Sequence, residues 1–512
     1  MHHILRGLAT NPALPPELVD RLISLADDDN ELAWYLDGRE DLSRTQVSAV
    51  AARAEGSAVS LAYQGRLTAA DIDPRAQPYA ALALLDEGAG PLEWARLFAA
   101  DPVRERREKL AACPGLPCDV VEMLAADPDV RVVAELARCT TAEVAGRLAR
   151  HPHAEVRRAV AANEATPPAA LAALMTGEGL PGPTHCLVCD REETPFVHDP
   201  QCPRTDCDLL PGASCDGSHE STVHDIRQAA LGNPATPTEA VAGFEDDPSM
   251  LLRQALARRP DLPPQVCARL AADPIPGVRA DLADNPAIDE ALIRVLAADS
   301  DPLVRREIVL HPRVPLDVLV QLARNTRIGP TLLPRIADAS PAELEELAAS
   351  PEPAARMLVA QRRDLPPEIR DRLADDPDAK VAKSIAPHPG LADGQLRAMV
   401  EHHGIRVLAR AATNPDATAA LLEDLTRHDP PVQKMFRELA RHPRATATAL
   451  LACLADFQAR PKAAGHPALP RSVIVELLTD EDERVVEAAS ANPSLPTAVM
   501  ADLVRRAEEV QG

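Results

Sequence analysis

The feature that most constrains the fold of this chain is a proline-led phrase that recurs about every 26 residues. One instance reads Asn11-Pro12-Ala13-Leu14-Pro15-Pro16, and another reads Arg259-Pro260-Asp261-Leu262-Pro263-Pro264. The leading prolines Pro234, Pro260, Pro286 and Pro312 are each 26 residues apart, and later ones continue the series to Pro493. A fixed period of this length is typical of repeat architectures, so the repeat takes precedence over any domain count based on length.

Each period predicts two short helices separated by a break. Val266 and Leu270 follow one leading proline at i, i+4 spacing, which places them on one face of a helix. Asp273-Pro274 then ends that helix, because proline forces the preceding residue out of the α region. Val278 and Leu282 repeat the spacing and predict a second helix. Neither helix buries its apolar stripe alone, so stacking on neighbouring repeats has to supply the core.

The composition agrees with this interpretation. The chain has 50 prolines among 512 residues, yet 46% of its residues are hydrophobic and only 2% are aromatic. Such an apolar content excludes a disordered chain, and a core of small aliphatic residues suits closely packed helices. We expect an all-α, right-handed solenoid of about eighteen repeats, degenerate over residues 1–100, regular over 101–176 and 223–512, and interrupted by an insert over 177–222.

The Leu-Pro-Pro start and the Asp-Pro…Val-Arg second half resemble the leucine-rich repeat variant family, within the wider class of HEAT- and armadillo-like solenoids. The resemblance covers most of residues 101–512 outside the insert. It implies a repeat scaffold that presents an extended surface to a partner. The common step of 26 is slightly longer than the family's unit, so we expect a full α-helix where that family has a 3₁₀ turn.

Two polar positions recur once per repeat. An arginine on the second helix occurs at Arg131, Arg157, Arg253, Arg279, Arg305 and Arg484, often with an acidic residue four positions earlier. It is either a row that binds an acidic ligand or a ladder of ion pairs between repeats, and repeat spacing favours the ladder. Histidines before proline occur at His151, His311, His388, His442 and His466, where other repeats have Asn, Asp or Arg, which indicates a role at the repeat boundary and not in catalysis.

The insert splits one repeat. From Glu164 to Pro234 the chain runs 70 residues where one repeat needs 26, which leaves a surplus of 44. The insert lacks apolar periodicity, so it cannot build a core of its own. Half of the ten cysteines lie in it, with histidines between them: Cys186, Cys189, Cys202, Cys207 and Cys215, with His185, His198, His219 and His224.

The spacing of these residues predicts a metal site. Cys186 and Cys189 form a Cys-x₂-Cys hook, which places two thiolates on one ion. The second pair is Cys202 with Cys207, His198 with Cys202, or Cys215 with His219. Tetrahedral Zn²⁺ accepts any of these sets, and its binding supplies folding energy that the insert otherwise lacks.

An iron–sulfur cluster is the alternative. Cys215-Asp216-Gly217-Ser218-His219 is identical to the CDGSH signature of a two-iron cluster family, although the Cys-x-Cys pair which that family needs upstream is absent. A leucine-rich repeat variant protein also carries an iron–sulfur cluster, in a terminal domain. The other cysteines, Cys113, Cys118, Cys139, Cys267 and Cys453, are expected to be core residues, because reduced cysteine behaves as a small hydrophobe.

The net charge and the absence of known motifs reduce the number of functions that this chain is expected to have. With 54 Lys and Arg against 78 Asp and Glu, the formal charge is −24, which makes a nucleic-acid partner unexpected. No secretory signal and no membrane span is predicted, so we expect a cytoplasmic protein with reduced thiols. No phosphate-binding loop or catalytic motif occurs. The sequence predicts a non-enzymatic scaffold that binds a protein, with a redox or metal sensor and a nucleic-acid-modifying protein as alternatives.

Overall fold

The computed structural model describes residues 2–26, 31–190, 219–326, 328 and 331–511. Within these ranges every regular element is a helix, and the only β pairing is an isolated parallel bridge between His153 and His185. The chain divides into two compact units, unit 1 with Met1–Leu67 and Gly329–Gly512, and unit 2 with Thr68–Ile328. The expected all-α helical-repeat fold is confirmed.

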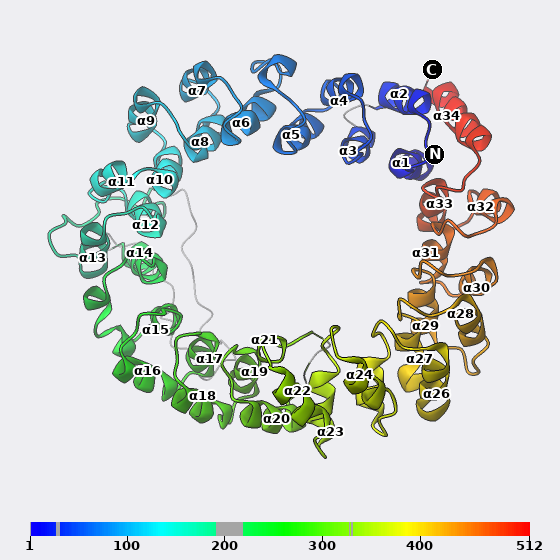
Figure 1. Cartoon of the computed structure of the whole chain (residues 1–512). Coiled ribbons are helices and arrows are strands. Elements are labelled where there is room, and N and C mark those ends of the chain that lie inside the picture. The colour runs from blue at the N-terminus through cyan, green and yellow to red at the C-terminus, as the bar shows by residue number, and fades with distance from the viewer. Residues whose placement is uncertain (1, 27–30, 191–218, 327, 329–330, 512) are drawn as a thin grey trace. The chain divides into compact units, whose positions relative to one another are not determined.

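In each unit a first helix, which follows the proline-led phrase, alternates with a second helix, which follows the break (Figure 1). Unit 1 contains α1 (His2–Thr10), α2 (Pro16–Leu25), α3 (Leu32–Asp37), α4 (Arg44–Ala51), α5 (Glu55–Tyr63), α21 (Pro334–Ala337), α22 (Pro341–Ala348), α23 (Pro353–Val359), α24 (Pro367–Ala374), α25 (Ala379–Ile385), α26 (Asp393–His403), α27 (Ile405–Ala411), α28 (Ala419–Thr426), α29 (Gln433–Leu439), α30 (Ala447–Cys453), α31 (Arg460–Ala464), α32 (Arg471–Leu477), α33 (Glu483–Ser490) and α34 (Thr497–Gln511).

Unit 2 contains η1 (Ala69–Asp71), α6 (Pro78–Asp86), α7 (Leu92–Ala99), α8 (Arg104–Ala112), α9 (Cys118–Ala125), α10 (Val130–Cys139), α11 (Ala142–Leu148), α12 (Ala154–Ala162), α13 (Pro168–Thr176), α14 (Glu220–Gly232), η2 (Thr238–Val241), η3 (Phe244–Asp246), α15 (Met250–Ala257), α16 (Pro264–Ala271), α17 (Pro276–Asp284), α18 (Glu290–Ala297), α19 (Pro302–Leu310) and α20 (Leu316–Asn325). Most first helices are fully α-helical, as the long repeat step predicts. In the repeat after the insert, the short 3₁₀ helices η2 and η3 take the place of the first helix.

The helices begin where prolines and aspartates stand. Pro168 and Pro264 are the first residues of α13 and α16, where the missing proline N–H leaves no hydrogen bond unmade. The second helices α10 and α19 begin after Asp129 and Asp301, whose carboxylates accept backbone N–H bonds from Arg131 and Leu303. The local sequence therefore specifies both helix starts of a repeat.

A polar side chain at the boundary between repeats, just before the leading proline where the repeat has one, links neighbouring repeats and is here called a rung residue. Asn285 Nδ2 donates to the carbonyl oxygens of Ala257 and Arg259 in the preceding repeat, at 2.8 and 2.7 Å. Equivalent pairs of bonds are donated by Asn233, Asn414, Asn492, Arg39, Arg66 and Arg259. These bonds satisfy buried carbonyl groups between repeats.

Four of the five singled-out histidines are rung residues. The Nε2 atoms of His311, His388, His442 and His466 lie 2.8–3.1 Å from a carbonyl oxygen of the preceding repeat. His151 lies instead at the second break, where its Nδ1 accepts from the His153 backbone N–H, as Asp127 accepts from Asp129 in the previous repeat. The prediction of a boundary role therefore holds for four of the five histidines, whereas His151 lies at the break inside a repeat, where it replaces an aspartate.

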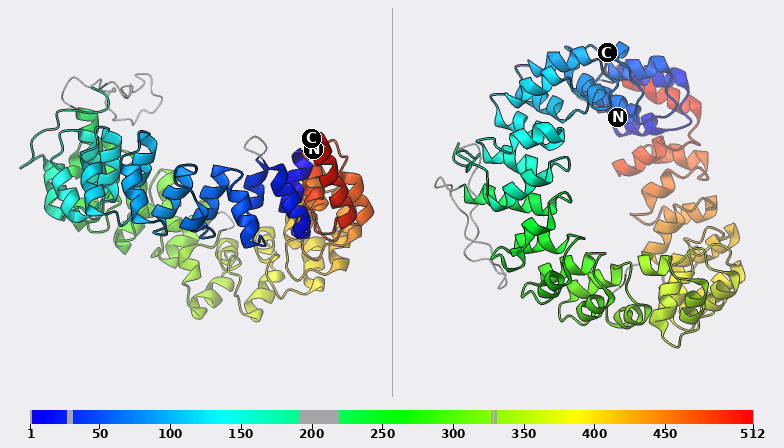
Figure 2. Two further views of the ribbon diagram at one scale, coloured as in Figure 1. Left: turned by 90° about the horizontal axis from the view of Figure 1, so that it is seen from above. Right: turned by 60° about the vertical axis from the view of Figure 1, so that its left-hand side comes forward.

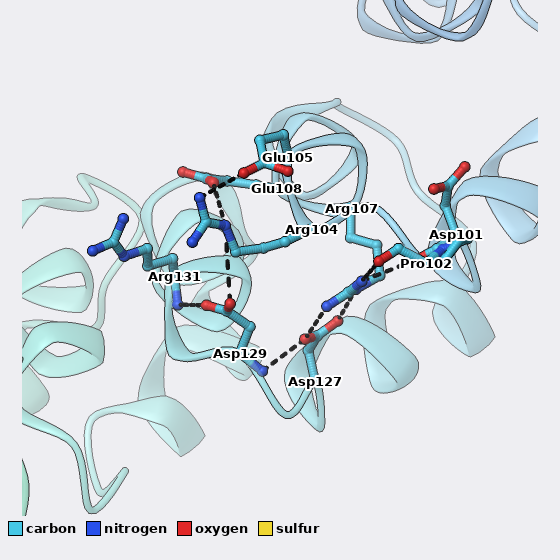
Figure 3. A network of polar contacts seen from close by, with 9 residues as sticks. All are labelled: Asp101, Pro102, Arg104, Glu105, Arg107, Glu108, Asp127, Asp129 and Arg131. Carbon is cyan, nitrogen blue, oxygen red and sulfur yellow. Dashed lines mark hydrogen bonds and ion pairs between the residues drawn. The ribbon is translucent and has the colours of Figure 1, made fainter. Parts of the chain in front are cut away.

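The arginine position forms a ladder of ion pairs between repeats. In Figure 3, the Arg107 guanidinium lies between the Asp101 carbonyl oxygen, at 2.9 Å, and the Asp127 carboxylate, at 2.7 Å. Arg253, Arg279 and Arg356 likewise bind the aspartate 20 residues later. The ladder interpretation is confirmed, although the acidic partner belongs to the following repeat and not to the position four residues earlier.

Arg305 occupies the ladder position and binds the Asp299 and Ser300 carbonyl oxygens, but 20 residues later the chain has Asn325 instead of an aspartate. Two other expected arginines lie outside the ladder. Ladder arginines stand six residues before a rung position, as Arg279 does before Asn285, whereas Arg484 stands eight before Asn492. Arg484 pairs with Asp482 at 2.8 Å and stacks over the Phe457 ring. Arg131 also stands eight residues before the next boundary residue, Cys139, so the sequence pattern assigned both arginines to the ladder wrongly.

The two chain ends of unit 1 pack together as one repeat. The chain starts with a second helix, α1, and ends with a first helix, α34. Helix α1 packs against α33, and α2 packs against α34, which places the N- and C-termini side by side (Figures 1 and 2). Asn11 then acts as the next rung after Asn492, because its Nδ2 donates to Ser490 and Asn492 carbonyl oxygens at 2.9 and 2.8 Å.

Candidate metal centre

The insert leaves the repeats after α13 and returns at α14. Gly177 ends α13 with φ +77°, a left-handed conformation that favours glycine. Helices α12 and α14 still pack directly on each other. Asn233 Nδ2 binds carbonyl oxygens 70 and 72 residues earlier, whereas Asn285 reaches back 26 and 28. The difference is 44 residues, so the repeat stacking continues across the insert without loss.

The first arm of the insert lies along the loop that precedes α12. Thr184 N–H donates to the Pro152 carbonyl oxygen at 2.8 Å, and Ala154 N–H donates to that of His185 at 2.8 Å. These bonds make the isolated bridge between His153 and His185. The backbone just before Cys186 is thereby held against α12.

Arg157 ties this arm into the arginine ladder. Its Nε donates to the His151 carbonyl oxygen, the position that other ladder arginines reach through Nη1, and its Nη1 donates to the Pro181 carbonyl oxygen, both at 2.6 Å. Twenty residues later the chain has Gly177, whereas Arg253, Arg279 and Arg356 have an aspartate at that distance. Burial lowers the pKa of Arg157, since the side chain is almost fully enclosed without the usual carboxylate. A backbone carbonyl of the insert thus substitutes for the ladder aspartate.

Three of the predicted ligands come together at the base of α14. The sulfur atoms of Cys186 and Cys189 and a ring nitrogen of His219 all lie within 4.8 Å of one another. The Cys189 sulfur is 3.9 Å from His219 Nδ1. Cys186 and His219 are buried, and His219 adopts a left-handed backbone with φ +56°. Non-glycine residues at positive φ are uncommon and cluster at functional sites.

The Cys-x₂-Cys turn itself is shaped to hold thiolates. The Cys186 N–H points at the Cys189 sulfur at 3.1 Å, and the Cys189 N–H points at the Cys186 sulfur at 3.4 Å. These donors stabilise negative charge on sulfur, but burial outweighs them and raises the pKa of the Cys189 thiol to about 11, so a bound metal ion would have to displace that proton. Two thiolates and one imidazole match the donor set of a structural zinc site with one ligand still to be supplied.

A second group shares one cysteine with the first. His185, Cys189 and Asp190 also place ligand atoms within 4.8 Å of one another. Asp190 lies 3.3 Å from His185 Nδ1 and 3.2 Å from Nε2 of His153, the residue that caps the start of α12. Burial opposes ionisation of Asp190, but the His185 hydrogen bond and the two histidine charges hold its pKa below the usual range. Burial lowers the pKa of His153, and Asp190 offsets part of that effect.

We interpret this second group as support for the first. Asp190 joins the hook to α12 through His153, which is the orienting arrangement that outer histidine–carboxylate pairs give to metal ligands. Sequence reasoning missed His153, Arg157 and Asp190 in this role. The one available signal was Arg157, a ladder arginine for which the position 20 residues later, Gly177, falls at the start of the insert.

The remaining predicted ligands Cys202, Cys207, Cys215 and His198 lie outside the described residues, so the fourth ligand stays a prediction. His224 is used elsewhere, with Nε2 at 2.7 Å from the Ser249 hydroxyl of the next repeat. Cys113, Cys267 and Cys453 are buried, and burial raises the pKa of the Cys113 and Cys453 thiols to about 12. Cys118 and Cys139 are exposed, so their assignment to the core was wrong.

Comparison with known proteins adds little to this geometry. No protein-family model matches the chain. No curated protein matches it either. Among solved structures, it is similar to an engineered protein, with 14% identity over 95% of this chain and 99% of that one and a TM-score of 0.14.

Two natural structures are similar at the same level. A chain of the Pds5–Scc1 complex is 13% identical over 96% of this chain and 68% of its own, with a TM-score of 0.16. SYS-1 is 10% identical over 94% of this chain and 99% of its own, with a TM-score of 0.20. TM-scores this low carry no argument about what this chain binds. No helix in the described part of the chain is long and apolar enough to cross a bilayer.

Proposed function

We propose that this protein is a non-enzymatic scaffold of the leucine-rich repeat variant kind that binds a protein partner. The ladder arginines and rung residues are engaged between repeats, so they do not form a row for an acidic ligand. The helix faces that point away from neighbouring repeats remain exposed, and solenoids use such faces as extended binding surfaces.

The observation that carries the proposal is the exposure of aromatic side chains in a chain that has few. Only 2% of residues are aromatic, yet Trp34 and Phe457 are 62% and 67% exposed. Aromatic side chains are enriched among residues that dominate the energy of protein–protein interfaces. Both lie in unit 1, on the stretches Met1–Leu67 and Gly329–Gly512.

Affinity capture from a native extract tests the proposal. A partner retained by the full chain should be lost with Trp34→Ala or Phe457→Ala, and retained with Met123→Ala, which removes an exposed non-aromatic side chain from α9. A specific partner that is held equally by all four proteins would contradict the role of the aromatic residues. Recovery of no specific partner would contradict the scaffold function.

We further propose that the insert holds a structural Zn²⁺ ion through Cys186, Cys189 and His219, with a fourth ligand from Cys202, Cys207, Cys215 or His198. The three described donors already converge within 4.8 Å. The ion would hold the base of the insert against α12 and α14. Thiolate ligands of this kind fit a reducing compartment such as the cytoplasm.

Metal analysis of the native protein tests this site. We expect one zinc per chain, lost in Cys186→Ser and kept in Cys118→Ser, which changes an exposed cysteine on α9. Circular dichroism should show the same helix content in all three proteins, because the repeats stack across the insert. Native protein free of metal would exclude the site.

One observation favours an iron–sulfur cluster as the second candidate. His219 is the last residue of the Cys215–His219 signature, and it is the residue that reaches the Cys186–Cys189 hook. Anaerobically purified protein with visible absorbance would support a cluster and a redox-sensing role. Colourless protein that contains one zinc per chain would exclude it.

A further inference from the structure

The strongest unassigned feature is the contact between the two chain ends in unit 1. The N-terminal face is defined by Gly7 on α1, Asn11 in the loop after it and Arg21 on α2. It lies against the C-terminal face, defined by Glu487 and Ser490 on α33 and Glu508 on α34. We call this contact the seam. No peptide bond crosses it, because it joins the first residues of the chain to the last.

The seam has the geometry of an ordinary contact between repeats. Asn11 binds the carbonyl oxygens of Asn492 and of the residue two before it, Ser490. Asn492 binds the carbonyl oxygens of His466 and of the residue two before it, Ala464. Distances across both contacts are 2.7–2.9 Å. The seam is therefore a full rung of the series and not an incidental approach of two termini.

The packing at the seam is close. A Cβ atom added to Gly7 would overlap the Glu487 carbonyl oxygen and the Ser490 side chain, so only glycine allows this approach of α1 to α33. Arg21 Nε donates to Glu508 at 2.7 Å at the outer edge. His3 lies 2.9 Å from Glu483 and 3.6 Å from Glu487.

The residues that meet at the seam are buried. Gly7 and Asn11 are buried on the N-terminal face, as are Ser490 and Asn492 on the C-terminal face. A chain with an open seam would leave the Ser490 and Asn492 carbonyl oxygens without the Asn11 amide that binds them.

We infer that the partner these faces fit, besides each other, is a second copy of this chain, with the N-terminal face of one copy docked on the C-terminal face of another. Every contact in the seam is between residues that a second copy also carries in the same arrangement. Closure within one chain competes with this pairing, because tethered faces meet at a high effective concentration. Two copies therefore pair when closure of the seam within one chain is blocked. Domain-swapped dimers arise in the same way, by exchange of a contact within one chain for the identical contact between two chains.

Two variants that block opposite faces test the inference. Gly7→Leu obstructs the N-terminal face and leaves the C-terminal face intact. Ser490→Leu does the reverse, since Ser490 lies where α1 approaches α33. Each full-length variant alone has only one usable face, so neither closes nor pairs with itself. A mixture provides one intact face of each kind.

Sedimentation velocity of the full-length chains gives the readout. We expect wild type and each single variant to be monomeric, and the mixture to form a dimer that contains one copy of each variant. A variant that carries both substitutions should not dimerise with anything. A mixture that stays monomeric while both variants keep wild-type helix content would overturn the inference, as would dimerisation of either variant alone.

A milder pair covers the case in which a bulky substitution unfolds an end repeat. Arg21→Glu and Glu508→Arg each place like charges across the seam at a partly exposed site. In a mixture of the two, every face finds an oppositely charged partner only on the other copy. Preferential dimerisation of the mixture supports the inference, and equal behaviour of mixture and single variants overturns it.

Discussion

Replacement of the rung histidine His388 by asparagine should make this protein less sensitive to acid. His388 Nε2 lies 3.1 Å from the Ala360 carbonyl oxygen and is buried. Burial, aided by the charges of Arg363 and Arg370, lowers its pKa to about 4. The next rung, Asn414, makes the same kind of contact with an uncharged amide, so His388→Asn should keep the bond and remove the titration.

The sign follows from proton binding. In the folded chain His388 stays neutral down to about pH 4, whereas in the unfolded chain it takes up a proton below its ordinary pKa of 6.5. Acid therefore favours the unfolded chain, and stability is lost as the pH falls from about 7 towards 4. At pH 5 the difference between the two pKa values corresponds to about 2 kcal/mol, and at pH 4 and below it approaches about 3 kcal/mol.

Hydrogen exchange of the α25 to α27 amides at pH 7.5 and pH 5 measures the free energy of local unfolding. A local measurement suits an array of repeats that need not unfold as one unit. Between the two conditions His388→Asn should lose about 2 kcal/mol less than wild type. Asn414→His should lose more than wild type, and His402→Asn, at an exposed site, should match it. Equal losses in wild type and His388→Asn would refute the reasoning.

Two further substitutions test packing between repeats. Arg279→Ala removes the arginine that pairs with the Asp299 carboxylate and should lower the free energy of unfolding by about 3 kcal/mol, with a lower thermal midpoint. Arg294→Ala, in an exposed ion pair, should leave the thermal midpoint unchanged. An equal effect of both substitutions would show that burial of the ion pair is irrelevant. Gly7→Ala should lower the thermal midpoint, because the added Cβ would overlap α33. Gly232→Ala should leave the midpoint unchanged, because its added Cβ meets open space. Equal midpoints in the two variants would contradict the close approach at the seam.

The regular part of the fold could be predicted because its signals are local. Prolines such as Pro264 and aspartates such as Asp129 start helices through their own backbone and side-chain chemistry, within a few residues. The insert was visible for the same reason, since a period of 26 makes a surplus measurable. The sequence could also place the rung histidines at a boundary, because a period fixes position without knowledge of the partner.

The site and the seam depend on contacts between distant residues. The Asn11-Pro12 phrase shows that Asn11 is a rung residue, but nothing near it shows that its carbonyl partners lie almost the whole chain away. The Cys-x₂-Cys hook is local, whereas the role of His153 depends on how the insert arm returns to α12. Cys118 and Cys139 were misassigned because helix position alone does not say which side of a repeat a residue faces.

Because α34 packs beside α1, two helices that are neighbours in space lie at opposite ends of the sequence. One repeat is assembled from the last helix and the first, so its two halves pack together without a covalent link between them. A short linker from Gln511 to His2 would make that link an ordinary helix–helix connection. The chain would then be opened between two other repeats of unit 1, and a circular permutant of this kind would carry the same contacts within that unit under a different numbering.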